Sequence, residues 1–225
     1  MRIDWLPVSA ASLVVGATGL FYGAQTMPRP DGYGEVLEFV VRGPDGLLSP
    51  AVVLLLGATA LILGLPALRS LVPQGRREIG GFLGMALLTL GVVMIAGFAQ
   101  QLLMLRNVVT HVPLAPGDLT RVMEDGLQAG MLQGAHLAFF AGELLLARTL
   151  WGACRVPYWI PIALVLHPVA LLAERLLGFT PFHGLPALFM AAGMAGAGIV
   201  ANLNNQPRHA SSRDIAARHA RENAA

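Results

Sequence analysis

Apolar residues gather in six long stretches, and polar residues, prolines and glycines separate them. Each stretch is long enough to cross the hydrocarbon core of a bilayer, which takes about 20 helical residues. A segment that crosses lipid must satisfy its own backbone hydrogen bonds, so these stretches have to be helices. The pattern predicts an all-α membrane protein, a bundle of about six transmembrane helices near residues 6–24, 50–68, 79–105, 130–151, 157–177 and 182–201.

The same pattern divides the chain into two parts. Residues 1–201 form a single transmembrane domain, and residues 202–225 form a polar, basic tail. Because this tail has few apolar positions and lies at a chain end, we expect it to be frayed or disordered.

Composition agrees with lipid as the main solvent of the protein. Of the 225 residues 55% are hydrophobic and only 12% are charged, and the mean hydropathy is +0.63. A soluble domain of this length needs more charge to cover its surface. The basic residues are scattered and are not interleaved with aromatics, so nucleic acid is not expected as a partner.

Arginines predict the orientation of the bundle. If the N-terminus lies inside, the segments on the cytoplasmic side hold ten arginines and those on the outer side hold five. Positive charge favours the cytoplasmic side, so both termini are predicted to be cytoplasmic. Trp5, Trp151, Tyr158 and Trp159 then form an aromatic belt at the inner interface. We expect a multi-pass protein of the cell membrane, the plasma membrane or a bacterial inner membrane.

Small residues and loop signals refine this topology. The spacings Gly19-x-x-x-Gly23 and Gly80-x-x-x-Gly84, with the small residues of 192–198, predict close helix packing. Residues 35–42 could form a short helix at the outer interface. Asp118 is a plausible N-cap, so the fourth helix could begin near Leu119.

Ionisable residues inside the predicted helices are the candidates for function, because burying them in lipid is costly. The fourth helix carries Gln133, His136 and Glu143 on one face, and the fifth carries His167 and Glu174. At about 1.5 Å of rise per residue, an antiparallel hairpin places His167 between Glu143 and His136, with Glu174 near His136 and Gln133.

The third helix adds two polar residues at a similar depth. Gln100 and Gln101 fall near its outer end, at about the level of the His and Glu residues. Together these seven residues predict a polar pocket in the outer half of the bundle.

Three interpretations of the polar residues remain open. They can bond to one another and fix the packing of the helices. A neutral His beside a buried carboxylate can act as an acid–base pair on a lipid-soluble substrate. His and carboxylate side chains on facing helices can also bind a metal, but no Glu-x-x-His or His-x-x-x-His spacing occurs. We therefore expect neither a metal site nor a cofactor.

Two segments resemble a known family. The Pro116-Gly117-Asp118-Leu119 start of the fourth helix and the Val156-Pro157-Tyr158-Trp159-Ile160 start of the fifth are similar to those of a family of bacterial six-helix integral membrane proteins, known only as a domain of unknown function. The resemblance covers about residues 6–200 and implies the six-helix fold. It brings no catalytic or binding residues with it.

These patterns favour a protein that binds a small or lipophilic ligand in an outward-facing polar pocket, or that serves as a subunit beside another membrane protein. The alternative is a membrane-embedded enzyme that uses the His/Glu pairs for acid–base or metal-assisted chemistry. No phosphate-binding loop, dinucleotide fingerprint or nucleophile elbow is present to name a reaction.

Overall fold

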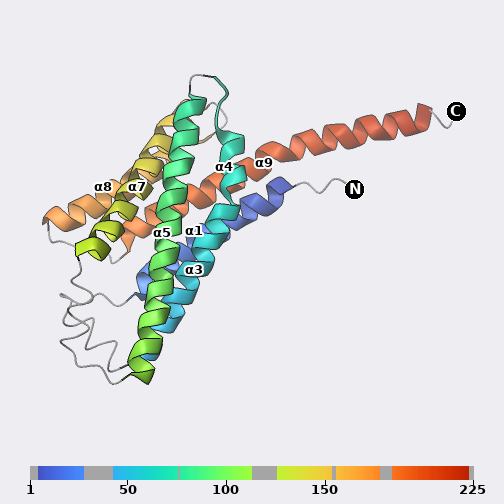
Figure 1. Cartoon of the computed structure of the whole chain (residues 1–225). Helices are drawn as coiled ribbons and strands as arrows, with labels where there is room; N and C mark the ends of the chain where they lie inside the picture. Colours follow the sequence, from blue (N-terminus) through green and yellow to red (C-terminus); the bar gives the residue numbers. More distant parts are fainter. Residues whose placement is uncertain are drawn as a thin grey trace.

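The computed structural model describes residues 5–27, 43–75, 77–112, 126–153, 156–177 and 184–222, and these parts of the chain are all-helical (Figure 1). They form seven α-helices and one 3-10 helix: α1 (Trp5–Thr26), η1 (Pro44–Leu47), α3 (Leu48–Leu63), α4 (Leu65–Leu71), α5 (Glu78–His111), α7 (Gly126–Trp151), α8 (Trp159–Leu177) and α9 (Leu185–Glu222). The predicted all-α class is therefore confirmed for the described residues.

Within the described ranges, four segments are long and apolar enough to cross a membrane: Trp5–Thr26, Pro44–Leu63, Glu78–His111 and Leu185–Asn205. This supports the prediction of a membrane protein. Helices α7 and α8 are not among the four; the apolar part of α8, Trp159–Glu174, is shorter. These two helices carry five of the seven polar residues that the sequence singled out, and the other two, Gln100 and Gln101, lie on α5.

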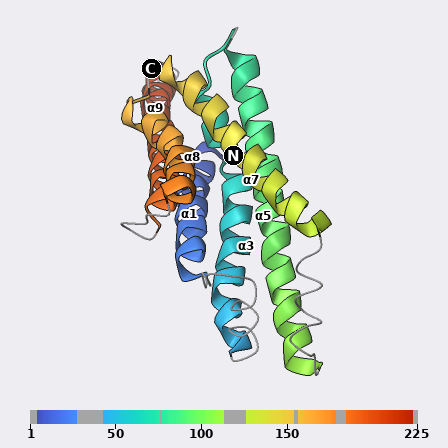
Figure 2. The same cartoon turned by 90° about the vertical axis from the view of Figure 1, so that its left-hand side faces the viewer.

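The six long helices pack in a closed ring. Helix α1 contacts α3 and α9, α3 contacts α5, and α5 contacts α7; α7 then contacts α8, and α8 contacts α9. Figure 2 shows α1, α3 and α5 side by side, with α7 and α8 in front of them. Every long helix therefore has two neighbours and one side facing the middle of the ring.

Glycines allow the helices of the ring to approach closely. A Cβ at Gly142 of α7 would lie 2.5 Å from the Leu88 backbone nitrogen of α5, so only glycine fits without a shift. In the same way a Cβ at Gly19 of α1 would lie 3.0 Å from the Gly57 Cα of α3. Gly193, in the small-residue run of α9, packs on Leu164. The predicted role of small residues in packing is confirmed at Gly19 and Gly193, whereas the contact at Gly142 was not predicted.

The second predicted helix, 50–68, is divided in the structure. Helix α3 ends at Leu63, Gly64 is a turn, and α4 begins at Leu65. Pro66 lies in the first turn of α4, where its missing N–H costs little. The Ala67 N–H donates to the Ser9 hydroxyl of α1 at 2.9 Å, and both groups are buried. The prediction of one unbroken helix was wrong because a side chain from another helix satisfies the new helix start.

The C-terminal prediction also needs correction. The tail after residue 202 was expected to be frayed, but the backbone of α9 continues as a helix to Glu222. Figure 1 shows this part of α9 running out beyond the ring, on the side where α1 begins. The predicted interfacial helix at 35–42 and the predicted cap at Asp118 lie outside the described residues.

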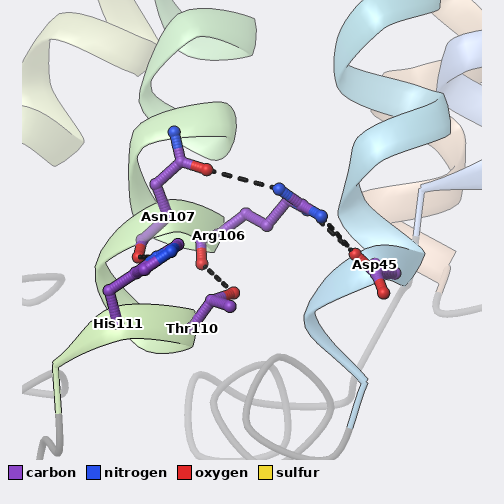
Figure 3. A network of polar contacts seen from close by, with 5 residues as sticks. All are labelled: Asp45, Arg106, Asn107, Thr110 and His111. Atoms are coloured by element: carbon purple, nitrogen blue, oxygen red, sulfur yellow. Dashed lines mark hydrogen bonds and ion pairs between the residues drawn. The ribbon is translucent and has the colours of Figure 1, made fainter.

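Ion pairs join the α3–α4 segment to α5 at both ends. On the side where α1 begins, the Arg69 guanidinium pairs with Glu78. At the other end, Arg106 of α5 pairs with Asp45 of η1, and its Nη1 lies 3.3 Å from the Asn107 amide oxygen (Figure 3). Because each pair includes groups that are exposed to solvent, each adds little stability and mainly fixes the register of neighbouring helices.

Candidate functional site: a cavity inside the helix ring

A cavity of about 370 Å³ lies within the ring, and all six long helices line it. Sixteen residues form its wall: Leu20, Ala24, Met27, Leu54, Ile95, Phe98, His136, Phe139, Phe140, His167, Leu171, Glu174, Gly184, Pro186, Ala187 and Met190. Those of α1 lie near its end, those of α3 and α9 lie in the first half of each helix, those of α7 lie near its middle, and those of α5 and α8 lie from the middle of each helix onward. The cavity therefore lies in the half of the ring away from the start of α1.

Polar groups occupy only one wall of the cavity. His136 belongs to α7, and His167 and Glu174 belong to α8. The lining residues from α1, α3, α5 and α9 are all without charge or hydrogen-bonding side chains. Three of the seven residues predicted to form a polar pocket line this cavity, and the rest of its wall is apolar.

The central contact of the polar wall joins Glu143 to His167. The His167 Nδ1 lies 2.6 Å from the Glu143 Oε2, across the interface of α7 and α8. Glu143 is 0% exposed and His167 is 6% exposed. The predicted approach of His167 to Glu143 is confirmed, and the pair is buried among apolar groups.

Close packing of α5 on α7 explains the burial of Glu143. Its neighbour Gly142 has no side chain, so α7 lies directly on the backbone of α5 at Leu88. A Cβ at Gly84 of α5 would in turn lie 3.1 Å from the Gly142 carbonyl oxygen. The glycine contact therefore removes the side of α7 next to Glu143 from contact with lipid or water.

Two phenylalanines hold the His167 ring. The ring packs edge-on against Phe140, with centroids 5.3 Å apart, and against Phe139, at 6.0 Å. Such edge contacts restrict the orientation of the imidazole. They keep one ring edge toward Glu143, while the ring itself forms part of the cavity wall.

One polar atom of the pair has no partner. The Glu143 Oε1 is buried and makes no hydrogen bond with any described residue. An unsatisfied buried acceptor is costly, by about 1–3 kcal/mol. Glu143 is therefore only half satisfied by His167, which distinguishes it from an ordinary packing residue.

Of the other five predicted site residues, two line the cavity and three do not. His136 is exposed on α7, yet it lines the cavity and lies 6.0 Å from the Phe140 ring. Glu174 is half-buried and lines the same wall. Gln133, Gln100 and Gln101 are exposed and are not part of the cavity wall.

Sequence reasoning missed the apolar wall. Phe98, Leu20 and Met190 are apolar residues of three different helices, α5, α1 and α9. Nothing in their spacing separates a cavity-lining residue from an ordinary packing residue. Among the described residues, no group of three or more His, Cys, Asp or Glu side chains is placed to hold a metal ion.

Comparison with known proteins gives no relative: no family model, no curated protein and no solved structure matches the chain. The resemblance to a six-helix family therefore stays a prediction.

Proposed function

We propose that this chain is a multi-pass protein of the plasma or inner membrane, with six transmembrane helices and cytoplasmic termini, that binds a small lipophilic molecule in the ring cavity. One observation carries the proposal: all six long helices contribute to a mainly apolar cavity whose few polar groups gather on α7 and α8. The cavity then lies in the outer half of the membrane.

The outer surface of α7 and α8 supports their place in the membrane. Large apolar side chains on these helices are exposed, as lipid-facing side chains would be: Leu137, Leu144, Val169, Leu172 and Leu176. At the end of the ring where α1 begins, Trp5, Trp151 and Trp159 are exposed as well. Tryptophan prefers the membrane–water interface, which agrees with an aromatic belt there.

Size and chemistry of the cavity favour a small lipophilic ligand. Its volume of about 370 Å³ lies within the range of small-molecule sites, about 300–1,000 Å³. Such sites combine an apolar lining with a few convergent polar groups that orient the ligand. His167 and Glu174 are groups of this kind on an otherwise apolar wall.

A second candidate function is catalysis within the membrane. The contact of the His167 Nδ1 with a buried carboxylate favours it, because a carboxylate that orients a histidine is a common part of acid–base sites. An enzyme loses turnover in Glu143→Gln while it stays folded. If the chain instead serves as a subunit beside another membrane protein, no molecule is expected to bind in the cavity.

A matched pair of variants tests ligand binding. Ala187→Phe places a phenyl side chain inside the cavity, while Ala192→Phe places the same side chain on an exposed face of α9. Organic extracts of the purified proteins are compared by mass spectrometry. We expect a lipophilic compound that co-purifies with wild type and Ala192→Phe and is depleted in Ala187→Phe. Equal extracts from all three proteins would contradict the proposal.

A further inference from the structure

The Glu143–His167 pair determines which polar group the cavity presents to a ligand. Glu143 does not line the cavity, whereas His167 does. The Nδ1 of His167 is engaged by Glu143, and this is the one hydrogen bond of the His167 ring among the described residues, so it leaves Nε2 on the other side of the ring. The Nε2 is therefore the polar atom that His167 offers to a bound molecule.

The net charge of the pair determines whether this Nε2 carries a hydrogen. A Glu143 carboxylate beside a neutral imidazole would leave one negative charge buried between helices. No Arg of the described residues pairs with Glu143, and its Oε1 has no partner. An uncompensated charge inside a membrane bundle is costly. A pair with no net charge is therefore favoured.

Each neutral form of the pair that leaves no buried donor unsatisfied places a hydrogen on Nε2. A proton on the Glu143 Oε1, with Nδ1–H donating to Oε2, would also give a neutral pair, but its O–H would have no acceptor among the described residues. If the proton lies on Glu143, its O–H donates to Nδ1, and the imidazole hydrogen is on Nε2. If the proton lies on His167, both ring nitrogens carry hydrogen and Nδ1–H donates to the carboxylate. In either form the Nε2–H is a donor.

We infer that the cavity selects lipophilic molecules with a hydrogen-bond acceptor, such as the carbonyl oxygen of a ketone or an ester, which receives the His167 Nε2–H. The inference rests on the proposed function and adds the chemical class of the ligand. A donor-only ligand would face the Nε2–H with its own hydrogen, and a hydrocarbon would leave the Nε2–H unsatisfied. His136 and Glu174 lie on the same wall, so the ligand's polar end faces α7 and α8.

Three compounds of nearly equal shape separate these cases. Fluorene has no polar group, fluorenone has a carbonyl acceptor, and carbazole has an N–H donor. Their binding to the full-length protein in nanodiscs is measured by equilibrium dialysis against empty nanodiscs of the same lipid, which subtracts partition into the bilayer. We expect fluorenone to bind about five- to tenfold more tightly than the other two, the contribution of one hydrogen bond.

Two variants assign the preference to the pair. The Glu143→Leu/His167→Phe double variant removes both partners together and should bind all three compounds equally. Glu143→Gln keeps an N–H that can donate to Nδ1, so its preference for fluorenone should remain. Equal binding of the three compounds by wild type, or a preference for carbazole, would overturn the inference alone. If wild type binds none of them, the proposed function fails as well.

Discussion

Glu143 and His167 lie 24 positions apart, on the consecutive helices α7 and α8, and the His167 Nδ1 lies 2.6 Å from the Glu143 Oε2 in a buried setting. This contact joins the two helices that carry the polar wall of the cavity. It also combines the two roles that the sequence left open: the pair stabilises the packing of α7 on α8, and its histidine faces the cavity.

Replacement of one partner should cost more stability than replacement of both. Glu143→Leu or His167→Phe alone leaves a buried polar group unsatisfied and should lower the free energy of unfolding by about 1–3 kcal/mol. The double variant removes both polar groups and should lose less than the sum of the two. Unfolding in mixed micelles, followed by circular dichroism, measures this coupling. Strictly additive losses would mean that the two side chains do not interact.

Glycine substitutions on α7 should separate helix packing from helix propensity. Gly142→Ala places a Cβ against the α5 backbone and should destabilise the protein by about 1–3 kcal/mol. Gly134→Ala is the control, because nothing lies within 4 Å of its Cβ position. That change should be neutral or slightly stabilising, since alanine favours helices over glycine. The same unfolding assay decides, and equal effects would show that α5 and α7 do not pack closely.

The hydrogen bond that starts α4 should be detectable through Ser9. Ser9→Ala removes the acceptor for the buried Ala67 N–H, which keeps only its bond to the Gly64 carbonyl. We expect a loss of about 1 kcal/mol in the free energy of unfolding. Thr18→Val is the comparison, because the Thr18 hydroxyl is exposed and bonds only within its own helix. A larger loss in Thr18→Val would contradict the account of α4.

Cysteine labelling tests the orientation of the bundle. In a Cys154→Ala background, single cysteines are placed at Asn107, at the end of α5, and at Gln74, just before its start; both positions are exposed. A membrane-impermeant maleimide should label Asn107→Cys in intact cells and Gln74→Cys only after permeabilisation. The reverse pattern would place the termini and the cavity on the opposite sides from those proposed.

The sequence predicted the helices well where local signals determine them. The bounds of α1 and α8 lie close to the predicted 6–24 and 157–177. It failed at Gly64, because the Ser9 hydroxyl that satisfies the start of α4 comes from a distant part of the chain. It also failed in the tail, where the 38-residue helix α9 continues through a stretch with few apolar positions.

The site was predictable only in part, for a related reason. The seven-residue spacings on α7 and α8 and the depth of each residue brought His167 to Glu143 correctly. Depth alone does not give the rotation of a helix about its axis, so it could not show that Gln100 and Gln133 lie on exposed faces. The apolar wall of the cavity depends on which helices are neighbours in the six-helix ring. The spacing of residues within one helix does not determine that order.

Photolabelling tests the central claim, that the ring cavity binds lipophilic molecules, most directly. A small lipophilic diazirine is photolysed with the membrane-embedded protein, with and without excess fluorenone, and labelled peptides are mapped by mass spectrometry. The account predicts labelling at cavity residues such as Phe98, Phe140 and Met190 that fluorenone suppresses, while labelling at the exposed Leu56 and Leu144 is unaffected. Labelling confined to exposed residues, or labelling of the cavity that fluorenone does not reduce, would contradict it.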